Sequence, residues 1–238
     1  MSSGPVHLSV VHLMSCRVAG RDGLLECVDE TCRWMEAGVG SDGSEDQDGT
    51  FLSAAQQRRD AWKLSLEEEL LRREDALPTV VRSANASARV KYAMVVSVAD
   101  EILRSQEGFV ACGKGCSHCC HMNVQISNVE AEKLQEWSGK QKAKILRSVS
   151  HAHDEFKGVK CPFLGTAGEC TVYESRPLAC RTHTSFGVDD YGCLSVNMHR
   201  LTVPMVRMTG IVEAYAEVVG GRSGIVLADI RDFFPEQT

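Results

Sequence analysis

Eight of the eleven cysteines in this 238-residue chain lie between Cys112 and Cys193, and four of them fall within CGKGCSHCCHM at residues 112–122. Thiols this close together belong to a metal site, a redox site or a disulfide scaffold, and each of these constrains the backbone around it. An odd number of cysteines in a chain of this length fits a disulfide scaffold poorly. The stretch therefore favours a fold that is organised around reduced thiols.

The N-terminus carries no convincing secretory signal. MSSGPVH contains no Lys or Arg, and the LSVVHLM segment that follows is short and is interrupted by His12. We therefore expect a cytoplasmic protein, because clustered cysteines in that compartment stay reduced and bind metal more often than they form disulfides.

Composition argues against two classes of partner. No apolar run approaches the roughly 20 residues that a helix needs to span a bilayer, so no membrane association is expected. The formal net charge is −6, whereas a nucleic-acid-binding protein usually presents a clustered basic surface. We expect no nucleic-acid partner, and the sequence identifies no protein partner.

The chain is expected to divide into four segments. Residues 1–53 form a flexible leader that ends in an acidic linker, GVGSDGSEDQDGT. Residues 54–107 are helical, residues 108–200 form the cysteine-cluster metal-binding domain, and residues 201–238 form a C-terminal helical segment that packs on it. No alternating strand series or internal repeat is visible. The expected fold is mostly α, a small helical domain with long, metal-ordered, Cys-rich loops.

Helical periodicity predicts two helices before the cysteines. The first covers residues 54–75, where Trp62, Leu66 and Leu70 share one face. The side-chain pairs Glu68–Arg72 and Glu69–Arg73 support this helix, and Pro78 is expected to end it. The second covers residues 86–106 and ends near Gly108. Its apolar stripe consists of Val90, Met94, Val98 and Ile102.

Further elements are predicted after the first cysteine cluster. Val124–Ile126 is extended, and the capping-box pattern from Ser127 to Glu130 opens a helix that carries Val129, Leu134 and Trp137. A helix is also expected over residues 140–156, loops over 158–193, a helix through the apolar positions from Met205 to Tyr215, and a short apolar segment over 225–230.

The spacing Cys112-x3-Cys116-x2-Cys119-Cys120 suits metal ligation, because a Cys-x2-Cys turn aims two sulfurs at one ion. Gly113 and Gly115 permit positive φ angles in so tight a loop. The adjacent residues Cys119 and Cys120 point in different directions, so one of them serves a second metal, bridges two metals or packs as a free thiol.

A second group, Cys161, Cys170 and Cys180, is spaced too widely to act locally and must reach the first group through tertiary folding. Arg176 and Arg181 lie beside this group. Their guanidinium groups either compensate thiolate charge, receive an anionic ligand or form ordinary ion pairs.

The ordered blocks CGKGCSHCC, VQIS with a following Glu, CPFL, VYESRP and Cys180-Arg181 resemble the family of putative zinc- or iron-chelating domains, the YkgJ-like cysteine-cluster proteins. The resemblance covers roughly residues 109–186. It implies a metal centre that holds zinc or an iron–sulfur cluster, with [4Fe–4S] the most plausible cluster if the metal is iron. The implied ligands are Cys112, Cys116, Cys119, Cys120, Cys161, Cys170 and Cys180.

Seven thiols exceed the needs of one four-ligand zinc site or one four-cysteine cluster. Cys193 would make eight, enough for two sites, although a packed free thiol is an equal alternative. His118, His121 and His183 are candidate ligands too, but the surplus of thiols favours all-cysteine ligation. We expect His151 and His153 to face solvent. We expect the dispersed cysteines Cys16, Cys27 and Cys32 to be structural or free.

These patterns predict a metal-binding protein that is structural if the ion is zinc and capable of redox or electron transfer if it is a cluster. An enzyme is the second interpretation, because flagellin lysine methylases carry a similar cysteine cluster. No nucleotide fingerprint or nucleophile signature supports it, and no catalytic residue is assigned. A zinc-stabilised protein-interaction module is the third.

Overall fold

The computed structural model describes residues 44–152, 155–198, 200–220 and 225–236. The predicted leader before residue 44, the three cysteines within it and His153 lie outside the described residues. Helices dominate the described chain, which confirms the mostly α prediction. No helix in these ranges is long and apolar enough to cross a membrane. The elements are α1 (Ser44–Ser65), α2 (Glu68–Ser83), α3 (Ala88–Ser105), η3 (His118–His121), β1 (Gln125–Ser127), α4 (Asn128–Ser138), η4 (Tyr173–Ser175), α5 (Leu178–Thr182), η5 (Tyr191–Cys193), α6 (Thr209–Gly220), β2 (Leu227–Asp229) and α7 (Ile230–Phe233).

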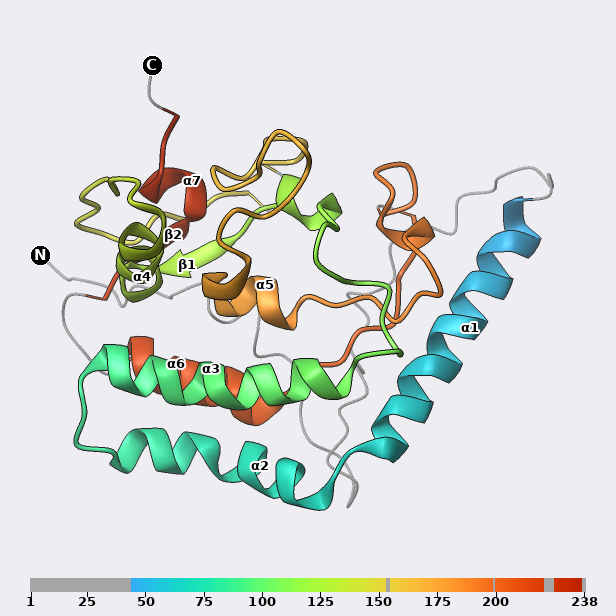
Figure 1. Cartoon of the computed structure of the whole chain (residues 1–238), viewed down its shortest axis with the longest axis horizontal. Coiled ribbons are helices and arrows are strands. Elements are labelled where there is room, and N and C mark those ends of the chain that lie inside the picture. The colour runs from blue at the N-terminus through green and yellow to red at the C-terminus, as the bar shows by residue number, and fades with distance from the viewer. Residues whose placement is uncertain (1–43, 153–154, 199, 221–224, 237–238) are drawn as a thin grey trace, which may run out of the picture. The chain divides into compact units, whose positions relative to one another are not determined.

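Helices α2, α3 and α6 pack together as one helical layer (Figure 1). Their apolar faces form a shared core, and Trp62 of α1 and Phe186 of a cysteine loop join it. The buried side chains of the three helices include Leu77, Val81, Tyr92, Val95, Val98, Ile102, Ile211, Ala214 and Val218. Burial of this many apolar side chains is the main stabilising contribution to such a layer.

A smaller second core lies where β1 and β2 pair in antiparallel fashion, with Ile126 opposite Ala228. Helices α4 and α7 pack beside this short sheet (Figure 1). The core contains Val124, Ile126, Leu134, Phe163, Val172, Ala228, Ile230 and Phe233, and Cys161, Cys170 and Cys180 pack against it. We call β1, β2, α4, α5, α7 and the loops that carry the cysteines the cysteine layer.

The first helix begins earlier than predicted. Residues 44–53, expected in the flexible acidic linker, form the first turns of α1. Tertiary contacts explain the difference, because the ring of Phe51 is buried against Tyr191 at a centroid distance of 5.3 Å, and the carboxylate of Asp48 accepts hydrogen bonds from Tyr191 and Arg200. Acidic composition alone could not reveal these distant partners.

The single helix predicted over residues 54–75 is two helices, separated at Leu66 and Glu67, and Pro78 lies inside α2 instead of ending it. Proline leaves the carbonyl four residues earlier without its helical donor. That carbonyl belongs to Glu74 and lies against Gly210 of α6, where an added Cβ would come within 2.0 Å of the oxygen. Helix α6 therefore packs closely on α2 at the turn that contains the proline.

Of the two predicted side-chain pairs, Glu68–Arg72 is present as an exposed contact at 3.9 Å. Arg73 instead reaches across to Glu101 of α3. The prediction of a Glu69–Arg73 pair is wrong, because a bidentate partner on the neighbouring helix is available.

The helix predicted over residues 140–156 does not form in the described part of that range. Gly139 ends α4 with a φ of +73°, and the following chain is irregular and forms backbone hydrogen bonds with the C-terminal segment. The amide of Ala143 donates to the carbonyl of Phe233, and the amide of Val149 donates to that of Leu227. His151, expected to face solvent, has a side chain only 16% exposed.

Other local predictions are confirmed. Ser127 and Glu130 form the predicted capping box, β1 occupies the expected extended segment, and α3 ends shortly before Gly108, whose φ is +83°. Two apolar positions differ, since Val90 of α3 is 51% exposed and Trp137 of α4 is also exposed. Met205 precedes α6 and lies outside the helix predicted for it.

Candidate metal centre

The first four cysteines lie on the turn that follows α3. Cys119 and Cys120 are on the single turn of η3, and the amide of Cys116 donates to the carbonyl of Gly113. Gly115 has a φ of +100°, as the tight loop requires. The positive φ expected at Gly113 is not observed.

The second group of cysteines is brought to the first by backbone contacts. The amide of Cys161 donates to the carbonyl of Cys120 at 2.8 Å. Cys170 pairs with Leu164 in an isolated bridge, and Cys180 lies in the middle of α5. Segments about forty and sixty residues away along the sequence thus meet the η3 turn, as the spacing predicted.

All seven predicted ligand thiols line one cavity of about 90 Å³. Every one of them is free, as is Cys193. Arg176, Arg181 and His183 also line this first cavity, and no carboxylate does. Within the described ranges, no three Cys, His, Asp or Glu side chains already converge as a metal-binding group. The donor chemistry fits a thiophilic ion, and the sulfurs would have to draw together on binding.

Burial sets the protonation of most of these thiols. It raises the pKa of Cys112 and that of Cys161 to about 11, and it raises the pKa of Cys170 and of Cys180 as well. A buried thiol without a counter-charge stays protonated at neutral pH. A bound cation would remove this penalty because it supplies the missing positive charge.

Cys119 is the exception. A hydrogen bond with the Cys120 thiol is the largest influence and lowers the pKa of Cys119 to about 7, against the opposing effect of burial. The same contact is the main reason that the pKa of Cys120 is raised. The positive charge of Arg176 further lowers the pKa of Cys119. The hydrogen-bonded pair of Cys119 and Cys120 therefore supplies a thiolate more readily than the other buried thiols.

The two arginines beside the second cysteine group have different roles. Arg181 is buried and is fully engaged by protein groups, donating to the carboxylate of Asp100 and to the carbonyls of Glu174 and Arg176. Arg176 stacks on the ring of Tyr173, with its guanidinium carbon 3.8 Å from the ring centroid. Of the two, Arg176 is the one that compensates thiolate charge, while Arg181 forms a structural ion pair.

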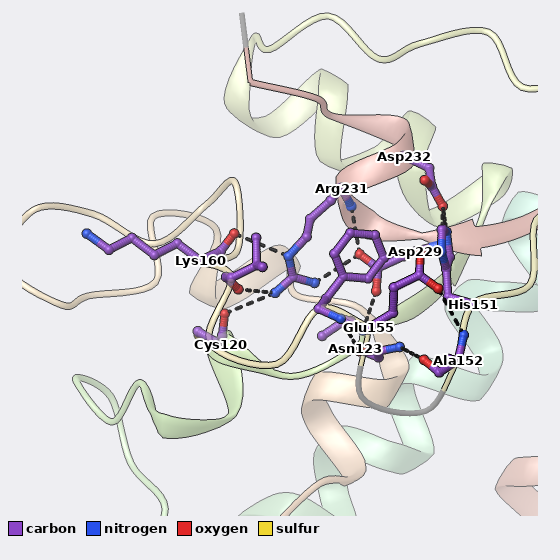
Figure 2. A network of polar contacts seen from close by, with 12 residues as sticks. Cys120, Asn123, His151, Ala152, Glu155, Lys160, Asp229, Arg231 and Asp232 are labelled. Atoms are coloured by element: carbon purple, nitrogen blue, oxygen red, sulfur yellow. Dashed lines mark hydrogen bonds and ion pairs between the residues drawn. The ribbon is translucent and has the colours of Figure 1, made fainter. Parts of the chain in front are cut away.

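Arg231 belongs to α7 and contacts the backbone of both cysteine loops (Figure 2). Its guanidinium group donates to the carbonyls of Cys120, Val159 and Lys160 at 3.3, 2.6 and 3.3 Å. Asp229 holds it in place through a contact of 2.9 Å. Since Lys160 precedes Cys161, one buried side chain fixes the backbone beside both thiols.

Glu130 of α4 positions Cys180 in a similar way. Its carboxylate is buried, with Glu130 2% exposed. It accepts a hydrogen bond of 3.0 Å from the amide of Leu178, the first residue of α5. Tyr92 of α3 and Tyr215 of α6 donate to the same carboxylate at 3.0 and 2.5 Å. The capping box revealed the local role of Glu130 but not these distant ones. For Arg231, the sequence signal was a charged residue inside an apolar segment.

A second cavity of about 300 Å³ shares part of this wall. His118 and His183 line it, whereas His121 lines neither cavity. His118 forms a hydrogen bond with Asp190 at 2.9 Å, and burial lowers the pKa of His183. Cys193 lines only the second cavity, and it was the uncertain eighth thiol of the sequence analysis.

Comparison with known families agrees with this geometry. Residues 111–197 match the CxxCxxCC family model, described as a putative zinc- or iron-chelating domain. No curated protein and no solved structure matches the chain. The matched segment contains all eight described cysteines, including Cys193. The match confirms the resemblance seen in the motifs: the cysteine-bearing segment is similar to domains of the CxxCxxCC type, which supports metal binding in general.

Proposed function

We propose that this protein binds metal through the thiols of its first cavity, holding either zinc or an iron–sulfur cluster. The observation that carries the proposal is that seven free thiols from three separate segments line one cavity that contains no carboxylate. Hard cations such as magnesium and calcium prefer oxygen donors, whereas zinc and iron–sulfur clusters are held by thiolates. The ligands proposed are Cys112, Cys116, Cys119, Cys120, Cys161, Cys170 and Cys180.

The groups around the thiols favour their thiolate form. Arg176 places its charge close enough to lower the pKa of Cys119 and of Cys170, although burial dominates for Cys170. The amide of Ser185 donates to the sulfur of Cys112 at 3.2 Å. Amide–sulfur hydrogen bonds of this kind stabilise metal-bound thiolates. We therefore expect the thiols to bind as thiolates and to release their protons.

The nature of the metal determines the role. Bound zinc with four thiolates has a closed coordination sphere and would fix the cysteine loops. A bound cluster would supply one-electron transfer, with a potential set by the hydrogen bonds and burial described above. We favour the cluster and a redox role, because the thiols outnumber those that a single zinc ion needs.

The test is metal analysis of the full chain purified without oxygen. We expect bound iron with acid-labile sulfide and a visible charge-transfer spectrum, and we expect Cys161→Ser to lower the bound metal. Bound zinc with no visible spectrum would replace the redox role by a structural one. Cys27→Ser, outside both the matched segment and the described residues, is the matched control and should leave the metal content unchanged. A folded protein that binds neither zinc nor iron would overturn the proposal.

A further inference from the structure

The eight described cysteines are distributed unevenly over the two cavities. Cys193 lines only the second cavity. Four other thiols line only the first, namely Cys120, Cys161, Cys170 and Cys180. Three thiols lie on the wall between the cavities and line both, namely Cys112, Cys116 and Cys119. Each cavity therefore has access to at least four sulfurs.

Cys193 is held in place by contacts on either side of it. The backbone amide of Ser185 donates a hydrogen bond to the sulfur of Cys112, and the hydroxyl of Ser185 forms a hydrogen bond with Cys193. Asp190 opens the turn of η5 that ends at Cys193, and its carboxylate bonds to His118, next to Cys119. These contacts bring Cys193 to the cysteine turn and argue against an isolated packed thiol.

Helix α1 packs against the η5 turn that carries Cys193. Phe51 packs on Tyr191, and Gly192 admits this ring because a Cβ there would come within 2.8 Å of it. Asp48 accepts a hydrogen bond from the hydroxyl of Tyr191 at 2.8 Å. A segment outside the matched domain thereby fixes the loop that carries Cys193.

We propose that the eight thiols form two adjacent four-thiolate metal sites. The Cys193 site consists of Cys112, Cys116, Cys119 and Cys193, and the Cys180 site consists of Cys120, Cys161, Cys170 and Cys180. The boundary runs between Cys119 and Cys120, whose sulfurs are in contact. Four thiolates complete the coordination of zinc or of a four-cysteine cluster, so each site is sufficient by itself. This inference rests on the proposed function and adds Cys193 as a ligand.

Metal stoichiometry of the full chain tests the inference. Native mass spectrometry and elemental analysis should give two zinc ions or two clusters per wild-type chain. Cys193→Ser should halve the bound metal by emptying one site, and Cys170→Ser should halve it by emptying the other. Cys27→Ser is again the control and should retain both. One centre per wild-type chain, or a Cys193→Ser variant with unchanged metal content, would overturn the two-site arrangement.

A measurement on the wild-type chain avoids dependence on how the variants fold. Cadmium added to the reduced, metal-free protein should saturate at two equivalents and give two cadmium NMR signals in the range of all-thiolate sites. Saturation at one equivalent with one signal overturns the second site but leaves the proposed function intact. Failure to bind cadmium, zinc and iron alike would overturn both.

Discussion

The helical layer and the cysteine layer reach a folded state by different means. Helices α2, α3 and α6 bury a continuous apolar core that needs no ligand. The cysteine layer has a smaller apolar core, short elements and buried polar groups such as Glu130, Asp229 and Arg231, with half-buried free thiols at its centre. Apolar packing tolerates local imprecision, whereas buried polar groups require specific partners. The candidate metal centre thus lies in the layer that depends most on individual contacts.

The largest effect on stability is expected from removing the carboxylate of Glu130, which links the two layers. Glu130→Ala would deprive Tyr92, Tyr215 and the amide of Leu178 of their buried acceptor. We expect the free energy of unfolding to fall by about 3–5 kcal/mol, since several buried donors lose their partner.

Chemical denaturation of the metal-loaded protein would measure this loss. Glu132→Ala is the matched control, because it lies on the same helix with its side chain 58% exposed. Equal stability of the two variants would show that the buried carboxylate does not join the layers.

A core truncation tests the helical layer alone. Ile102→Ala removes a buried side chain of α3 and should cost about 3 kcal/mol through lost burial and the cavity that it leaves. Metal content should stay unchanged at temperatures where the variant is folded. Val90→Ala, exposed on the same helix, should have little effect on either quantity. Loss of metal from folded Ile102→Ala would show that the metal site depends on the core of the helical layer.

Alkaline pH should act first on the cysteine layer, because the ordinary pKa of the tyrosines buried in the helical layer, Tyr92 and Tyr215, is about 10 and lies above that of a thiol. The pKa of Cys112 and that of Cys161, both about 11 because of burial, lie above the ordinary thiol value. Stability from such a group is present below the ordinary value and is lost as pH rises through the folded-state value. Metal-free protein should lose roughly 2 kcal/mol per thiol between about pH 9 and 11.

Urea denaturation across this pH range, with and without metal, would measure that loss. Metal-loaded protein should resist it because its thiols are already ionised. Cys161→Ser should flatten the decline of the metal-free chain, and an unchanged slope would show that burial of this thiol does not set the pH dependence.

Arg231 tests whether the cysteine layer needs a specific geometry as well as charge. Arg231→Lys keeps the charge but cannot reach the carbonyls of Cys120, Val159 and Lys160 with one planar group. We expect a loss of about 1–2 kcal/mol in stability and about 10–100-fold weaker metal affinity. Competition with a chromophoric chelator measures the affinity. Arg147→Lys, at an exposed position, should behave as wild type, and full affinity in Arg231→Lys would remove the positioning role.

The smallest effect is expected at the surface between the layers. Arg89 of α3 pairs with Glu136 of α4 through two contacts of 2.5 and 2.7 Å, but both side chains are exposed. Arg89→Ala should change the free energy of unfolding by no more than about 0.5 kcal/mol. A double-mutant cycle with Glu136→Ala measures the coupling. A coupling above about 1 kcal/mol would mean that surface charge helps to hold the layers together.

The sequence predicted the elements whose signal is local. The helix α3, the capping box of α4 and the joining of the two cysteine groups all follow from short patterns or spacings, although Val90 of the predicted α3 stripe is exposed. Helix α2 passes through Pro78, and Gly210, more than a hundred residues later, packs on the affected carbonyl. Residues 140–152 are not helical, and the amides of Ala143 and Val149 donate instead to carbonyls of the C-terminal segment. Neither partner is visible in a sequence window.

The same distinction applies to the candidate metal centre. Cysteine spacing was enough to select the thiols that line the first cavity. It did not reveal that Arg231 and Glu130 hold the loops on which these thiols lie, since both act through backbone groups of distant residues. Ligands carry a chemical signature, whereas the residues that orient them are recognisable only once the chain is folded.

Because β2 and Arg231 lie near the C-terminus, the cysteine layer can be completed only late in synthesis. Every described cysteine leaves the ribosome before residues 227–231, which supply the partner strand of β1 and the guanidinium group beside Cys120. The nascent chain therefore presents its thiols in loops that still lack these contacts. Metal delivered during translation would meet an open site, and the arrival of the last strand would close the layer around it.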